Sequence, residues 1–125
     1  MAKSPKEMAL LAAKILSDKK AEDVVILDIS SISILADYFV IATGKSSIHV
    51  KALADEVEEK LSESGCKVRG KEGYEEARWV LIDFSDVIVH IFDEESREYY
   101  DLERLWADAP RLDIDTDEDF AYNNQ

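Results

Sequence analysis

The stretch from Trp79 to Trp106 reads WVLIDFSDVIVHIFDEESREYYDLERLW, and it decides the fold of the chain. Residues 78–84 and 86–92 are rich in β-branched and aromatic side chains, and only Ser85 separates them. Two such runs with so short a connection predict a tight antiparallel hairpin. Residues 94–106 change to a helical pattern, which predicts a last, broken helix. Four of its side chains are expected inward or at the sheet edge: Tyr99, Leu102, Leu105 and Trp106.

Side-chain alternation divides the predicted hairpin into an aliphatic face and an aromatic face, because successive residues of a strand point to opposite sides. The aliphatic face carries Val80, Ile82, Val87, Val89 and Ile91. The aromatic face carries Trp79, Leu81, Asp83, Ile88, His90 and Phe92. We expect helices to cover the aliphatic face and to leave the aromatic face uncovered.

The remaining sequence supplies helices and strands for the same sheet. A capping residue, a proline and a glutamate in Ser4-Pro5-Lys6-Glu7 predict a helix that runs to about Lys19. Composition and periodicity predict four further elements: strands at residues 24–29 and 38–43, a helix from Ser47 that ends at Gly65, and a short edge strand at residues 67–70. The fold class is therefore α/β, a mixed sheet with helices mainly on one face. One domain is expected over residues 1–110, with a disordered acidic tail at 111–125.

The charge of the chain restricts the class of partner. Its 125 residues have a formal net charge of -13 at pH 7. The tail holds five acidic residues and one Arg, so the domain without it is still strongly acidic. Because Lys and Arg provide the affinity for phosphate backbones, this balance argues against direct nucleic-acid binding and favours a basic protein partner.

The cysteine content and the N-terminus indicate a cytoplasmic protein. Cys66 is the single cysteine, and a chain with one thiol suits a reducing compartment. Residues 1–20 contain too many charges for a signal peptide or a membrane span.

The sequence offers little support for catalysis. Gly44-Lys45-Ser46 copies the end of a phosphate-binding loop, but the first glycine of that motif would fall at Phe39, inside a predicted strand. A nucleotidyltransferase would need two carboxylates one residue apart on the strand that follows the helix, where this chain has Lys67, Val68 and Arg69. We therefore expect no enzyme activity and no cofactor.

The histidines and the cysteine do not form a metal or catalytic set. His49 and His90 belong to different predicted elements, and Cys66 is near neither of them. This leaves no zinc site and no nucleophile with a base. His90 alternates with apolar residues, so a structural role and a recognition role are both open.

The aromatic face and the last helix supply the candidate binding residues. Trp, Tyr and Arg dominate interface energetics when a partner desolvates them, but large rings also build cores, and both interpretations stay open for each ring. The candidates for partner binding or dimerisation are Trp79, Leu81, His90, Phe92, Arg97, Tyr99, Tyr100 and Trp106.

The assembled motifs resemble the ribosomal silencing factor family, known as RsfS or Iojap. The matching pieces, in the family's order, are residues 37–44 (DYFVIATG), Glu72-Gly73, residues 79–83 (WVLID), residues 89–92 (VHIF), Arg97 and residues 100–106 (YDLERLW). The series spans Met8 to about Ala109 and is specific as a whole. Departures are His49, where many relatives carry Gln, and the acidic tail.

The resemblance implies a nucleotidyltransferase-like fold without transferase activity. It also implies binding to the large ribosomal subunit through ribosomal protein fourteen, a block of subunit joining that represses translation when nutrients are scarce, and a homodimer when free. Organelle relatives imply a role in large-subunit assembly as an alternative. A divergent nucleotide-binding enzyme and an acidic adaptor with no ribosomal role are the rival functions.

Overall fold

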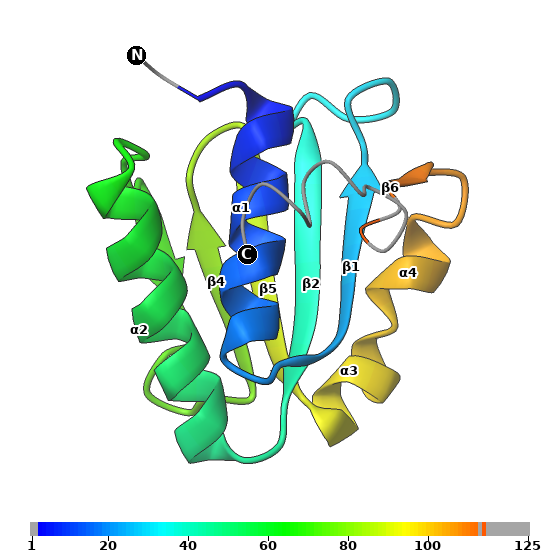
Figure 1. The fold of residues 1–125 in the computed structure, drawn as a ribbon. Coiled ribbons are helices and arrows are strands. Elements are labelled where there is room, and N and C mark those ends of the chain that lie inside the picture. Colours follow the sequence, from blue (N-terminus) through cyan, green and yellow to red (C-terminus); the bar gives the residue numbers. More distant parts are fainter. Residues whose placement is uncertain (1–2, 113, 115–125) are drawn as a thin grey trace.

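The computed structural model describes residues 3–112 and 114 of the chain. Figure 1 shows one sheet with helices packed against it. In chain order, the elements are α1 (Pro5–Asp18), β1 (Glu22–Asp28), β2 (Tyr38–Gly44), α2 (Ser47–Glu63), β3 (Gly70–Glu72), β4 (Trp79–Asp83), β5 (Val87–Asp93), α3 (Glu94–Tyr100), α4 (Leu102–Leu105) and β6 (Arg111–Leu112). The strand order is β3-β4-β5-β2-β1-β6, and the sheet is mixed, because β2 and β5 are parallel while the other neighbours are antiparallel.

The predicted hairpin and the predicted first helix are confirmed. β4 and β5 pair antiparallel, with Trp79 opposite Phe92 and Leu81 opposite His90. Ser4 caps α1, since its hydroxyl accepts from the Glu7 N–H at 3.1 Å while the Glu7 carboxylate accepts from the Ser4 N–H at 2.9 Å. These reciprocal bonds satisfy backbone donors that the first helical turn leaves free.

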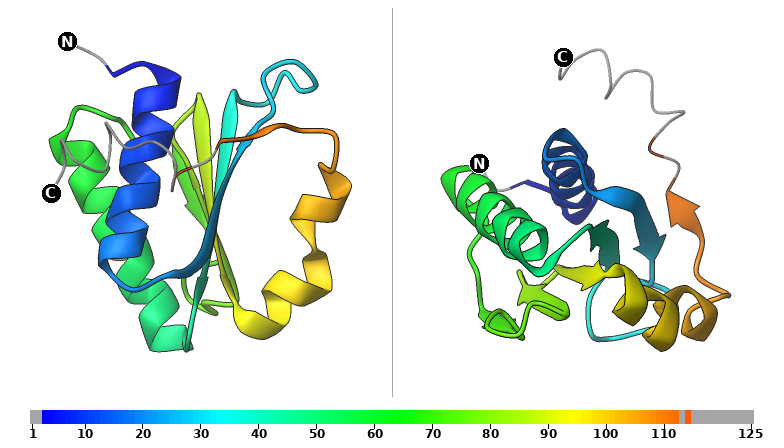
Figure 2. Two further views of the ribbon diagram at one scale, coloured as in Figure 1. Left: turned by 45° about the vertical axis from the view of Figure 1, so that its right-hand side comes forward. Right: turned by 90° about the horizontal axis from the view of Figure 1, so that it is seen from below.

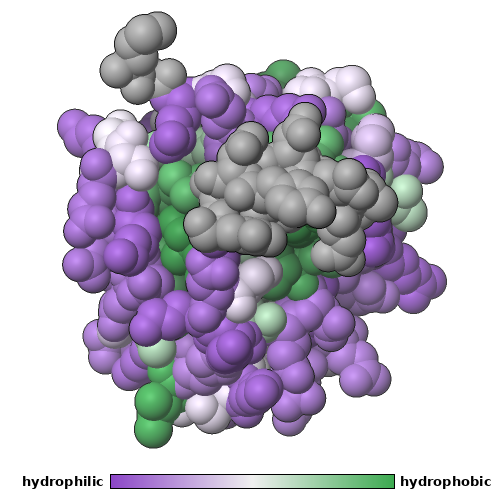
Figure 3. All heavy atoms as spheres, in the orientation of Figure 1, coloured by the Kyte–Doolittle hydropathy of each residue, from purple (hydrophilic) through white to green (hydrophobic). Residues whose placement is uncertain are grey.

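Two long helices cover the aliphatic face of the sheet, as predicted. Figure 2 shows α1 and α2 side by side on this face and the short helices α3 and α4 on the opposite face. Every aliphatic-face residue of the hairpin is fully buried against the long helices: Val80, Ile82, Val87, Val89 and Ile91. Seen from this side, hydrophilic residues form most of the outer surface (Figure 3).

The prediction of an uncovered aromatic face is wrong for its centre. Phe92 is 0% exposed and His90 is 3% exposed. They are buried because the chain folds back after β5, so that Leu102 of α4 and the Trp106 ring pack over this face in a second hydrophobic cluster. The face is left partly open where Trp79, Leu81, Asp83 and Ile88 lie, each of them half-buried.

The ends of the fold also differ from prediction. The edge strand β3 lies at Gly70–Glu72, later than predicted. Tyr99 and Leu105 of the last helical segment, expected inward or at the sheet edge, are 80% and 74% exposed. The fold also continues past residue 110, since β6 pairs with β1. Of the tail predicted to be disordered, residues 111–125, residue 113 and residues 115–125 lie outside the described residues.

No helix of the described residues is long and apolar enough to cross a bilayer.

Candidate functional site

Seven rings form a continuous aromatic cluster across the aromatic face. Its members are Phe39, Trp79, His90, Phe92, Tyr99, Tyr100 and Trp106. Ring centroids are 5.3 Å apart for Trp106 and Phe39, 4.6 Å for Phe39 and His90, and 5.9 Å for His90 and Trp79. The series continues from Trp79 to Tyr100 at 4.7 Å and from Tyr100 to Tyr99 at 5.0 Å. Contacting rings of this kind stabilise one another beyond the area that they bury.

His90 has a structural role in this cluster. The Trp79 indole N–H donates to His90 Nδ1 at 3.0 Å, so the neutral ring carries its proton on Nε2. Burial lowers the pKa of His90 to about 3, which keeps the imidazole neutral at physiological pH. Nε2 is buried without a hydrogen-bond partner among the described residues. His90 therefore holds the Trp79 ring in place from inside the fold.

The accessible part of the cluster lies at Tyr99 and Tyr100, which are 80% and 45% exposed. A hollow of about 430 Å³ beside them is lined by Gly73, Glu76, Arg78, Trp79, Glu95, Ser96, Tyr99 and Tyr100. Trp79, Leu81 and Trp106 are half-buried and extend this surface over the sheet. We call Trp79, Leu81, Tyr99, Tyr100 and Trp106 the exposed aromatic surface.

Sequence reasoning missed two members of this site, Phe39 and Ile88. Phe39 is buried and touches both His90 and Trp106, whereas Ile88 is half-buried beside the exposed aromatic surface. The strand alternation places Ile88 on the aromatic face, but an aliphatic side chain there gives little signal for binding. The strand alternation of residues 38–43 would have placed Phe39 on a face with Ile41, although it could not show which face.

Arg97, one of the candidate partner-binding residues, is an internal clamp of the fold. Its Nε and Nη2 donate to the Glu103 carboxylate, with a shortest distance of 2.7 Å. Nη1 donates to Thr43 Oγ1 of β2, and Nη2 also donates to the Asp23 carbonyl of β1, both at 2.8 Å. Four of the five guanidinium N–H groups are thus used within the fold. The clamp joins α3 and α4 to the two neighbouring strands.

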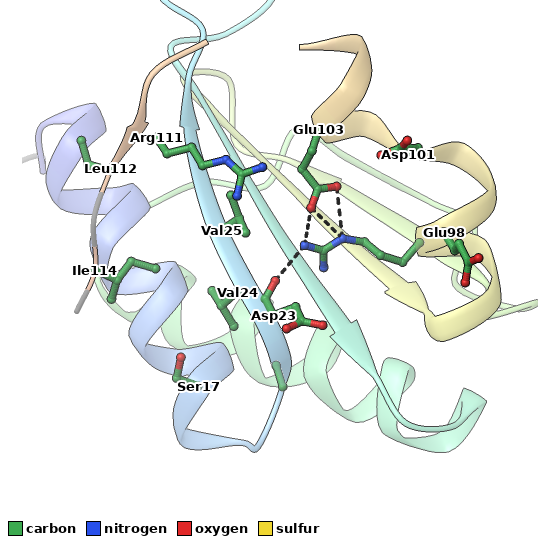
Figure 4. A pocket seen from close by; sticks show the side chains of 12 residues that line it. Ser17, Asp23, Val24, Val25, Glu98, Asp101, Glu103, Arg111, Leu112 and Ile114 are labelled. Carbon is green, nitrogen blue, oxygen red and sulfur yellow. Dashed lines mark hydrogen bonds and ion pairs between the residues drawn. The ribbon is translucent and has the colours of Figure 1, made fainter. Parts of the chain in front are cut away.

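The clamp borders an open groove of about 910 Å³ (Figure 4). The Arg97 guanidinium donates to Glu103 and to the Asp23 carbonyl (dashed lines in Figure 4), and Arg111 of β6 also lines the groove. Acidic residues form part of its wall, but no group of His, Cys, Asp and Glu within the described residues could hold a metal ion. The groove is lined by residues of α3, α4, β1 and β6.

Arg97→Gln should lower the free energy of unfolding by about 2–3 kcal/mol at pH 7, because it leaves the Glu103 carboxylate without its charged donors. Burial raises the pKa of Glu103, but the Arg97 hydrogen bonds and charge outweigh it, so this pKa lies below its usual range. A carboxyl group with a lower pKa in the folded state than in the unfolded state stabilises the fold above its unfolded-state pKa, which is about 4.3 for Glu. This stabilisation is lost as the pH falls through the folded-state pKa. Urea unfolding at pH values from 7 to 3 measures this. The difference in free energy of unfolding between wild type and Arg97→Gln should become smaller below about pH 4.

The control for this prediction is Lys14→Gln. Lys14 Nζ lies 2.9 Å from the Asp18 carboxylate, which is well exposed, so the loss should be within about 0.5 kcal/mol. A gap between wild type and Arg97→Gln that stays constant down to pH 3 would contradict the assigned role of Glu103.

The turn between β2 and α2 is closed by its own side chains. His49 Nδ1 accepts from the Lys45 N–H at 2.9 Å, and its Nε2 donates to the Lys19 carbonyl at 2.9 Å. Ser46 caps α2 by accepting the His49 N–H. Because the backbone N–H of Lys45 is already used, the turn is poorly suited to cradle a phosphate. A glutamine at position 49 has one acceptor and one donor for the same two bonds.

Comparison with known proteins identifies relatives of this chain. A family model described as "Ribosomal silencing factor during starvation" matches residues 2–125. The ribosomal silencing factor RsfS of Bacillus subtilis is 47% identical over 110 residues, which cover 88% of this chain and 93% of that protein. A crystal structure of a Chromobacterium violaceum protein superimposes with a TM-score of 0.82 at 42% identity, covering 84% of this chain and 88% of that one.

A mouse protein named "Mitochondrial assembly of ribosomal large subunit protein 1" is also similar, with 28% identity over 103 residues that cover 78% of this chain and 44% of the mouse protein. The family model, the B. subtilis relative and the superimposed structure each match most of the chain. The chain therefore belongs to the ribosomal silencing factor family, RsfS.

Proposed function

We propose that this protein represses translation in the cytoplasm by binding the large ribosomal subunit and sterically blocking its joining to the small subunit. It acts by contact and not by catalysis. The partner on the subunit is ribosomal protein fourteen, and the contact surface is the exposed aromatic surface. Membership of the silencing factor family supports the ribosomal target.

The observation that carries this proposal is the exposure of Tyr99 and Tyr100 at the end of a packed aromatic cluster. Rings fixed by their neighbours lose little side-chain entropy when a partner covers them, which makes them good binding anchors. The charge of -13 steers the protein toward a basic ribosomal protein and away from bare RNA. Three buried or internally bonded residues support these rings from inside the fold: His90, Phe92 and Arg97.

Tyr99→Ala should weaken binding to isolated large subunits about thirtyfold, as expected for loss of an anchor worth about 2 kcal/mol. Its fold should be unaffected, because the ring is 80% exposed. The measurement is co-sedimentation with large subunits, with small subunits and with both together. Wild type should bind only the large subunit and reduce joining, and binding to neither subunit would refute the proposal.

Ile48→Ser is the matched control for surface substitution. Ile48 is also 80% exposed, but it lies in the first turn of α2, and α2 packs on the opposite face of the sheet. Its affinity for large subunits should equal that of wild type. If the control loses as much affinity as Tyr99→Ala, the contact surface has been assigned to the wrong side.

The same surface is proposed to form a homodimer when the protein is free, so that subunit binding requires the dimer to open. Assembly of the large subunit is a second candidate function, favoured by the name of the mouse relative. Reduced joining of mature subunits by the purified protein supports silencing, whereas binding only to immature large subunits would favour assembly.

A further inference from the structure

The loop between β1 and β2 exposes an unusual amount of aliphatic surface. Seven large hydrophobic side chains of the described residues are exposed, and three of them lie in this loop. Ile32 is 48% exposed, Leu35 is 66% exposed and Ile34 is fully exposed at its tip. Clustered apolar side chains in water mark interaction sites more often than single ones do.

This loop has a defined shape. The Ile29 N–H donates to the Asp37 carbonyl at 2.9 Å and closes the base of the loop. The Leu35 N–H donates to Ser33 Oγ at 3.0 Å near the tip. The Asp37 N–H donates to the Asp86 carbonyl at 2.8 Å, which fastens the loop to the turn between β4 and β5. A preorganised loop loses less entropy on binding than a flexible one.

The base of the loop is continuous with the exposed aromatic surface. Ile29 and Ala36 are buried in the same hydrophobic cluster as Phe39, and the half-buried Trp106 packs against that cluster. Leu105, directly before Trp106 in the chain, is 74% exposed. One partner surface could therefore cover both the loop and the end of α4.

The charges around the loop indicate which class of partner it can bind. Asp28 and Asp37 flank the loop in sequence, and Asp86 lies against its base. Asp28 is paired with Tyr38 across β1 and β2. Burial first, and then the carboxylates of Asp28 and Asp37, raise the pKa of Tyr38. A second copy of this chain or an anionic lipid surface would meet like charge here, whereas a basic protein would meet opposite charge.

We propose that the β1–β2 loop is a second docking element for the large subunit, with Ile34 and Leu35 entering an apolar hollow that has a basic rim. The occupant is the same ribosomal protein that the exposed aromatic surface contacts. This inference rests on the proposed function and deepens it. It predicts an interface with two anchors, one aromatic and one aliphatic.

The test is the double variant Ile34→Ser/Leu35→Ser, with Ile48→Ser as the control of equal chemistry on the other side of the molecule. Equilibrium co-sedimentation with isolated large subunits should show at least a tenfold loss of affinity for the loop variant and none for the control. Thermal unfolding should be unchanged in both, because the three side chains are exposed. Sedimentation equilibrium of the free protein should show the same self-association as wild type.

Other outcomes separate the failure of this inference from the failure of the proposed function. If wild type and the loop variant bind large subunits equally while Tyr99→Ala binds weakly, the loop inference is overturned and the proposed function stands. The loop inference is also overturned if the variant loses self-association or adsorption to phosphatidylcholine vesicles while it still binds large subunits normally. Either loss would show that the loop binds a second copy of the chain or a lipid surface. If wild type does not bind large subunits, both fall.

Discussion

Replacement of Phe92 by alanine should lower the free energy of unfolding by about 3–5 kcal/mol. The Phe92 ring is 0% exposed and stacks on Trp79 with 5.0 Å between centroids. Its removal leaves a cavity under the aromatic cluster that the surrounding β-sheet cannot close, and the cost of such cavities adds to the lost burial. Urea unfolding monitored by circular dichroism measures the change directly.

Phe92 was predicted from the sequence as a binding residue, so this variant also separates the two roles. Tyr99→Ala is the control, with an expected change within about 0.5 kcal/mol because its ring is largely in water. A Phe92→Ala protein of normal stability that fails to bind large subunits would show that the ring acts at the interface and not in the core.

Substitution of Gly73 by alanine should cost about 3 kcal/mol or more, which is large for the addition of one methyl group. Gly73 has φ +80°, where L residues are strained, and a Cβ here would lie 2.1 Å from the Trp79 carbonyl oxygen. The obstacle is backbone, so the turn between β3 and β4 must open to admit the methyl group. The Ala77 N–H to Gly73 carbonyl bond, 3.0 Å long, would be disturbed as well.

Gly65→Ala is the matched control, since Gly65 has φ +89° but no atom within 4 Å of an added Cβ. This control isolates backbone strain, which is worth about 1–2 kcal/mol. Chemical unfolding of both variants gives the difference. Equal losses would mean that strain alone, and not the contact with the Trp79 carbonyl, requires glycine at position 73.

The sequence was sufficient to predict the β4–β5 hairpin and the aliphatic face. Both depend on local patterns, because a period of two sends Val80 and Ile82 to one side and Trp79 and Leu81 to the other wherever the sheet is placed. The start of α1 was predictable for a similar reason, since its capping box lies within four consecutive residues.

The covering of the aromatic face could not be predicted from such patterns. Asp101 separates α3 from α4 in a left-handed conformation with φ 48°, and an aspartate there gives a much weaker signal than a glycine would. This break redirects the chain, so that Leu102 turns inward while Tyr99 stays in water. The sequence predicts that the last helix is broken, but it does not show where the break falls, and the position of the break decides which side chains face the sheet.

The role of Arg97 was hidden for a related reason. Arg97 and Glu103 are six residues apart, a spacing that does not bring side chains together on one helix. They meet only because the chain bends at Asp101. Thr43 and Asp23, the other partners of Arg97, are 54 and 74 residues away in sequence. Contacts of this kind depend on the finished fold.

The strand order has a consequence for how the chain acquires its structure. β1 and β2 form one antiparallel pair within the first 44 residues, and β4 and β5 form another from residue 79 onward. The two pairs meet along the parallel seam between β2 and β5, which joins residues about 50 positions apart. Contacts that close so long a loop form late and slowly. The folding barrier of this protein is therefore expected at the seam, when two preformed hairpins dock.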